Sequence, residues 1–136
     1  MCKTMGFQEI SHTADCAIRV WASDLTALFT EAALGLNSIA GVQIGGGGRL
    51  NRDVSLRAPD AESLLIAFLS ELIYAQENES LAFDWFKVVV SEHELAGTMA
   101  GAPLVALTRH VKAATFHNLQ IRRFSGTFEV EIVFDV

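Results

Sequence analysis

The sequence predicts an α+β fold in one domain: a two-layer sandwich of two helices packed on a mixed, mainly antiparallel sheet of about six strands. Two observations predict it. The spacing of apolar residues switches along the chain between a period of 3.6 and a period of two. The 136 residues, 51% of them apolar, are also enough for one core but too few to favour a second domain. We therefore expect residues 1–136 to fold as a single unit.

Two segments have the helical period. The first follows a candidate N-cap at Ser23 or Asp24 and stops near Gly41. The second follows Ala58-Pro59, with Asp60 placed to cap it. Each has one apolar stripe that is predicted to face the core. The stripes consist of Leu25, Leu28, Phe29, Ala32, Leu36 and Ile39 in the first helix, and of Leu64, Leu65, Phe68, Leu69, Leu72 and Ile73 in the second.

Alternating segments predict the strands. They cover 16–22, 54–56, 86–91 and 95–99. A break over 101–103 follows the last of these, and 110–121 continues the same pattern of strands and turns. After a turn at Ser125-Gly126, the last strand places Phe128, Val130, Ile132 and Phe134 on one side. If that side is buried, Asp135 points away from the core and is available for binding.

Charge and composition exclude several classes of function. The net charge is −6, and ten Lys and Arg residues are too few for a protein that coats nucleic acid by itself. Two cysteines are too few for a disulfide scaffold, and the first residues lack the pattern of a signal peptide, so we expect a cytoplasmic protein. No apolar run approaches the roughly 20 residues of a membrane span, so no membrane partner is expected.

Two short acidic segments lie at opposite ends of the sequence. They are His12-Thr13-Ala14-Asp15 and Phe134-Asp135-Val136, where the Asp135 side chain and the Val136 carboxylate crowd together. Hard divalent cations bind several oxygen ligands in one place, so a meeting of these segments would make a metal site. Such a sparse set predicts weak binding, or binding completed by a partner or by a nucleotide phosphate. Without further evidence, Asp15 is equally well explained as a turn or capping carboxylate.

Other motifs support competing functions. His12, His110 and His117 could bind zinc, but their scattered spacing without Cys-x-x-Cys favours histidines that make structural hydrogen bonds or that support the ligands of a metal. The glycines at 45–48 could approach a phosphate, but no Gly-Lys-Ser/Thr follows, so a flexible turn is the better interpretation.

A stand-alone hydrolase is a third alternative. Ser11 with His12, or Ser125 with His117 and Asp135, could supply a nucleophile and a base. No Gly-x-Ser-x-Gly elbow supports this function.

Five motifs together resemble the archease family over nearly the whole chain. They are 7–15 (Phe-Gln-Glu-Ile-Ser-His-Thr-Ala-Asp), 28–36 (Leu-Phe-x-x-Ala-Ala-x-Gly-Leu), 70–74 (Ser-Glu-Leu-Ile-Tyr), 111–117 (Val-Lys-Ala-Ala-Thr-Phe-His) and the ending at 132–136 (Ile-Val-Phe-Asp-Val). The resemblance implies a non-catalytic accessory protein. It would activate the tRNA-splicing RNA ligase, promoting guanylylation and multiple turnover, and would meet RNA only through that ligase. Chaperone-like modulation of tRNA-modifying enzymes, such as a tRNA methyltransferase, is the alternative that the resemblance leaves open.

The resemblance also implies a site. A divalent cation, calcium in the first place and magnesium or manganese as alternatives, would be held by Asp15, Asp135 and Val136. His12 and His117 would stand near the ligands, and Lys112 would contribute to activation of the partner. Without the resemblance, Lys112 would be interpreted as an ordinary exposed lysine on a strand edge. The chain departs from the family pattern at Phe116, where many members have a tyrosine whose hydroxyl is missing here.

Overall fold

The computed structural model describes residues 5–11 and 16–136, which form two helices, a π-helical turn and nine strands. The elements are β1 (Gly6–Ser11), β2 (Cys16–Ala22), α1 (Leu25–Ala40), β3 (Gln43–Ile44), β4 (Leu50–Arg57), α2 (Ala61–Tyr74), η1 (Ala75–Glu79), β5 (Leu81–Val90), β6 (Glu94–Ala106), β7 (Ala113–Ala114), β8 (Arg122–Phe124) and β9 (Thr127–Asp135). In this part of the chain, neither helix combines the length and the apolar character that crossing a membrane requires.

The predicted α+β class is confirmed, but the described strands form two sheets instead of one. The first has the order β1-β2-β9-β7, with β8 also paired to β9; in the second, β6 pairs with β3, β4 and β5. Every pairing between the described strands is antiparallel. The count exceeds the expected six because three strands were not predicted: β1, which has six residues, and β3 and β8, which have only two or three residues and are too short for an apolar period to reveal.

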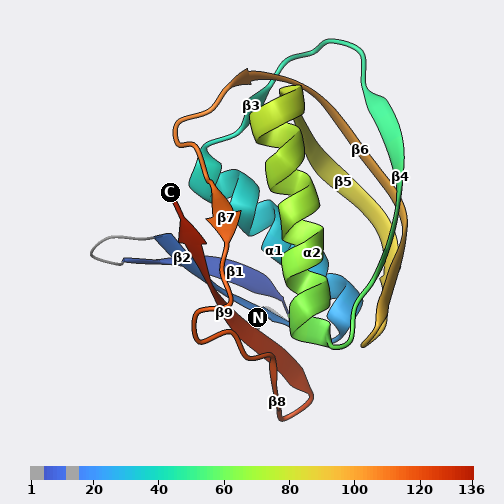
Figure 1. Ribbon diagram of the computed structural model, residues 1–136, viewed down its shortest axis with the longest axis vertical. Helices are drawn as coiled ribbons and strands as arrows, with labels where there is room; N and C mark the ends of the chain where they lie inside the picture. The colour runs from blue at the N-terminus through green and yellow to red at the C-terminus, as the bar shows by residue number, and fades with distance from the viewer. Residues whose placement is uncertain (1–4, 12–15) are drawn as a thin grey trace.

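The helices allow the two sheets to share one core. Helix α1 contacts β1 and β2 of the first sheet and β5 of the second, while α2 contacts β7 and β4. In the view of Figure 1, the crossed helices have β4, β5 and β6 on one side and β1, β2 and β9 on the other. Both apolar stripes lie in this core, except that Leu25 is only partly buried.

The ends of α1 form as the sequence predicts. Asp24 is the N-cap, and its Oδ1 accepts a hydrogen bond from the Ala27 N–H at 2.7 Å. Gly41 ends the helix with a left-handed backbone (φ 62°), which a residue without a side chain adopts at little cost.

Two strand predictions were wrong. Pro103 does not break a strand, because β6 continues through it to Ala106. Along one edge of β6, the pairing with β4 ends at Gly101 and the pairing with β3 begins at Leu104. Pro103 lies between these two pairings, where a residue without an N–H is tolerated. The segment 110–121 contains only the short strand β7; most of the rest is an irregular loop.

A buried polar chain fixes η1 against the rest of the fold. The Gln76 side chain, 5% exposed, donates from Nε2 to Asn37 Oδ1 at 3.0 Å, and Asn37 Nδ2 donates to the Phe83 carbonyl at 2.8 Å. These bonds connect η1, α1 and β5, and they satisfy an amide that would be costly to bury alone. They also position Glu77, whose Oε2 lies 2.9 Å from Nδ1 of His110.

The N-cap of α2 predicts a dependence of stability on pH. Oδ1 of Asp60 accepts a hydrogen bond from the Ser63 N–H at 2.7 Å, and this bond, with one to the Ser63 side chain, lowers the pKa of Asp60 below its ordinary value of 3.8. A lowered pKa means that the stabilisation is complete above the ordinary value and is lost as the pH falls through the folded-state value. In urea unfolding from pH 7 to pH 2, wild type should lose stability relative to Asp60→Asn, which caps without titrating. A difference between the two proteins that stays constant with pH would contradict this assignment.

Candidate functional site

The candidate site lies at the end of β9. Val130, Ile132 and Phe134 are buried, as predicted, and Phe128 packs partly against the core. Asp135 is exposed, which confirms that it points away from the core. Val133 is buried as well, although it lies on the opposite side of the strand from Phe134.

The start of β2 lies beside the end of β9. In the antiparallel register of these strands, Cys16 faces Phe134. The residue that follows Asp15 is therefore opposite the residue that precedes Asp135. His12 and Asp15 themselves are outside the described residues, so their predicted part in the site stays a prediction.

On its other side, the end of β9 is bordered by the segment that contains Lys112. Ala113 faces Asp135, and the Lys112 N–H donates to the Asp135 carbonyl at 2.8 Å. Thr115 secures the same segment, because its N–H and its Oγ1 both donate to the Val133 carbonyl, at 3.0 and 2.9 Å. The exposed Lys112 also lines a groove of about 370 Å³ with Tyr74 and Glu77. The structure thus brings Lys112 and Asp135 together through their backbones.

The two described histidines of the zinc alternative are engaged separately. His110 pairs with Glu77 in η1. His117 is exposed in the loop after β7, where its N–H donates to Thr115 Oγ1 at 3.3 Å and its Nε2 lies 3.3 Å from the Asn118 side-chain amide. Over residues 5–11 and 16–136, no three His, Cys, Asp or Glu side chains are grouped to hold a metal ion.

The Ser125, His117 and Asp135 triad of the hydrolase alternative does not form. Ser125 lies in the turn that precedes β9, and Asp135 lies at the far end of that strand. A strand rises about 3.4 Å per residue, so the two side chains are separated by roughly 30 Å. That distance is far beyond the hydrogen-bond reach that a triad needs.

Arg109 is a residue of this region that sequence reasoning missed. Its Nη1 donates to Cys16 Sγ at 3.0 Å and to the Ile39 carbonyl at 3.5 Å, and its N–H donates to the Ala40 carbonyl at 3.1 Å. These bonds hold its positive charge against the first residue of β2, beside the end of β9. The contact with Cys16 joins residues 93 positions apart, and no local sequence pattern signals such a contact.

The described part of the site fits a hard cation. The Asp135 carboxylate is exposed, Val136 follows it, and all of the donors they offer are oxygens, the ligands that calcium and magnesium prefer. Two residues alone are too few for a complete shell, so the predicted site would also need Asp15, which lies outside the described residues, and ligands from elsewhere.

The fold and this strand end are those of a small α+β protein with known relatives. A sequence model of the archease protein family matches residues 7–136, and the chain therefore belongs to that family. Protein archease of Methanopyrus kandleri is 30% identical over 97% of this chain and 100% of its own length. Protein archease of Methanosarcina mazei is 26% identical over 96% of this chain and 95% of its own length.

A solved structure shows the same fold. The crystal structure of an archease from Thermotoga maritima, described there as a possible chaperone, superposes with a TM-score of 0.69. That match covers 95% of this chain and 96% of the other at 19% identity.

Proposed function

We propose that this protein is a metal-binding accessory protein that activates an RNA ligase of the tRNA-splicing type, promoting its guanylylation and its multiple turnover. The observation that carries the proposal is the register at the end of β9. Cys16 faces Phe134 and Ala113 faces Asp135, so the start of β2 and the segment that contains Lys112 border the end of β9 from its two sides. Membership of the archease family supports the same function.

Each residue has a role that follows from its chemistry. Asp135, Val136 and Asp15 would hold the cation through oxygen atoms, leaving places for ligands from the ligase or from a phosphate. When bound, the cation supplies a positive charge that such ligands can share with this protein. Lys112 is exposed and is fixed by its backbone bond to Asp135, and its side chain lines the groove with Tyr74 and Glu77, where it would offer a positive charge to the partner. Arg109 and the His110–Glu77 pair hold the segment 109–112 in place.

The test combines metal binding with ligase activation. Asp135→Asn and Asp15→Asn keep the size of the side chain but remove its charge, so we expect each to weaken calcium binding and to reduce multiple-turnover RNA ligation at least about tenfold. Thermal melts give a readout without the ligase. Calcium at 100 times its Kd should stabilise wild type by about 2.7 kcal/mol and the variants much less.

The matched control is Asp53→Asn. Asp53 is an exposed carboxylate on β4, in the other sheet, where Oδ1 accepts only a 3.3 Å bond from Thr98. It should leave both readouts unchanged. Full activation by Asp135→Asn, together with no calcium-dependent stabilisation of wild type, would refute the proposal.

A chaperone-like modulator of tRNA-modifying enzymes, such as a tRNA methyltransferase, is the second candidate. The description of the Thermotoga protein as a possible chaperone favours it. A partner that recognises only shape should be indifferent to the charge of Asp135. Retained stimulation of a methyltransferase by Asp135→Asn, with no effect of wild type on the ligase, would select this function.

A further inference from the structure

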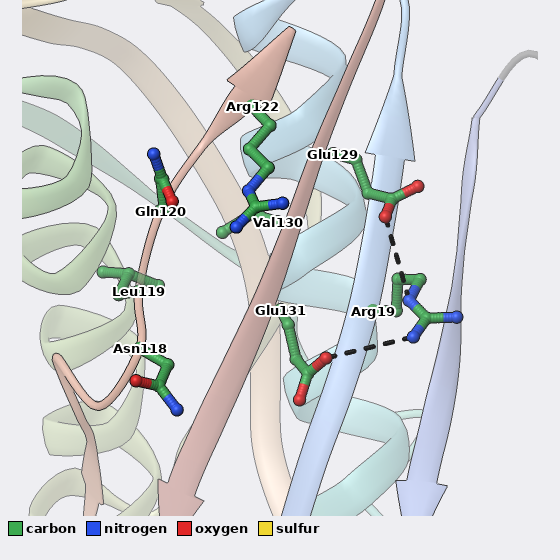
Figure 2. Close-up of a pocket in the computed structure, with 8 residues that line it drawn as sticks. All are labelled: Arg19, Asn118, Leu119, Gln120, Arg122, Glu129, Val130 and Glu131. Carbon is green, nitrogen blue, oxygen red and sulfur yellow. Dashed lines mark ion pairs between the residues drawn. The ribbon is translucent and has the colours of Figure 1, made fainter. Parts of the chain in front are cut away.

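A second candidate site lies on the outer face of the first sheet, away from the end of β9. β8 pairs with β9 as far as Arg122 opposite Glu129, and β7 pairs with it again only from Ala114 opposite Phe134. Between these pairings the loop 116–121 follows a separate path, and a groove of about 660 Å³ opens beside β9 (Figure 2). This volume is within the range of about 300–1,000 Å³ that is usual for small-ligand sites. We call it the outer groove.

Charges of both signs line the outer groove. Nε of Arg19 lies 3.9 Å from Glu129 Oε1, and its Nη2 lies 3.9 Å from Glu131 Oε2 (Figure 2). Both distances are longer than hydrogen bonds, so Arg19 leaves the acceptor capacity of Glu129 largely unused. Arg122 takes part in none of the ion pairs among the described residues, and its guanidinium points toward β9 in Figure 2. The groove thus offers a cation and a carboxylate that can both bind a ligand.

An exposed aromatic ring stands next to this pair. Phe124 is 78% exposed, the most exposed large apolar side chain of the described residues. It lies two residues after Arg122 in β8, so the two side chains leave the same face of the strand about 7 Å apart. The hairpin is held by a turn in which Ser125 (φ 51°) and Gly126 (φ 77°) are both left-handed, the geometry of a tight two-residue connection.

We propose that the outer groove binds a nucleotide. Arg122 takes the phosphate through its planar N–H groups, and Phe124 stacks on the base. Glu129 accepts hydrogen bonds from ribose hydroxyls or from N–H groups of the base. The Asn118 and Gln120 side chains, which line the other wall, can both donate and accept.

The mixture of groups selects this ligand class. A purely anionic ligand would be repelled by Glu129 and Glu131, and an apolar one would make no use of the Arg122 guanidinium and would desolvate it. A nucleotide has an anionic end, an edge rich in donors and a flat ring, which match Arg122 and Glu129 of the groove and the exposed Phe124 two residues further along β8. The net charge of −6 disfavours a long nucleic acid contact, so one nucleotide unit, free or within an RNA strand, is the expected occupant. This inference concerns the isolated chain and does not depend on activation of a ligase.

The experiment titrates the isolated protein with GMP, AMP and a single-stranded ten-residue oligouridylate, followed by NMR amide shifts and calorimetry. We expect saturable binding with shifts in β8, β9 and 116–121. Arg122→Gln and Phe124→Ala should each raise Kd about tenfold, since one charge-assisted contact or one stacking contact is lost. Binding of the mononucleotides would identify a free nucleotide as the source, and binding of the oligouridylate alone would identify a nucleotide of RNA.

The matched controls are Lys87→Gln and Val89→Ala, which remove an exposed charge and an exposed apolar side chain from β5 in the other sheet. They should change Kd by less than about twofold, as expected of substitutions outside the contact. Absence of saturable binding by all three probes, or equal binding by Arg122→Gln and wild type, would overturn the proposal. If neither nucleotide nor RNA binds but Phe124→Ala weakens association with the ligase, the surface contacts protein and the proposal is likewise overturned.

Discussion

Gly101→Ala is expected to destabilise the protein by about 3 kcal/mol or more, at the upper end of the cost of overpacking. Gly101 is buried in β6, where it faces Leu50 of β4 on one side and Phe83 of β5 on the other. A Cβ at this position would overlap the Ala82 carbonyl oxygen and would stand 2.8 Å from both the Ala82 carbonyl carbon and the Phe83 Cα. These are backbone atoms, so the strand itself would have to move.

The consequence is large because β6 pairs with every other strand of its sheet. A domain of this kind is stable by about 5–15 kcal/mol in total, so such a loss lowers its melting temperature markedly. Urea unfolding monitored by circular dichroism measures this loss of stability.

The control is Gly46→Ala. An added Cβ at this position meets no atom within 4 Å, and the φ of Gly46 is not positive. It should be neutral or slightly stabilising. Equal stabilities of the two variants would show that the close contact between Gly101 and the backbone of β5 does not limit the stability of the protein.

Phe68→Ala should cost about 3–5 kcal/mol, the usual range for removing a fully buried aromatic side chain. Phe68 projects from α2 and is 0% exposed. Its ring stacks on Phe29 of α1, with centroids 6.1 Å apart, and meets the edge of Phe86 of β5 at 5.8 Å. The substitution therefore leaves a cavity where both helices and the second sheet come together.

Chemical denaturation of three variants separates the effect of burial on stability from the effect of residue type. They are Phe68→Ala, Phe68→Leu and Phe124→Ala. Phe68→Leu should lose less stability, because it retains much of the volume. Phe124→Ala removes the same side chain from a position that is 78% exposed, and should change stability by no more than about 0.5 kcal/mol. A loss at Phe124 as large as that at Phe68 would contradict the assignment of the core.

Local sequence patterns were sufficient for most of the elements. Asp24 and Asp60 cap the two helices as predicted, because a cap depends on residues only three positions away. The alternation of β9 placed Asp135 outside the core for the same local reason. The short strands and the passage of β6 through Pro103 were not predictable, because they depend on which partners lie beside each residue.

The same distinction between local and tertiary information applies to the candidate site. By itself, the sequence determined the types of its groups: the acidic residues at 135 and 15, the lysine at 112, and their resemblance to archeases. Only the tertiary structure decided that Cys16 lies opposite Phe134, that the Lys112 N–H bonds to Asp135, and that Arg109 reaches Cys16. The physical reason is that helical and strand periods record the environment of each residue along its own segment. The antiparallel register between segments from opposite ends of the chain is set by the packing of the whole core.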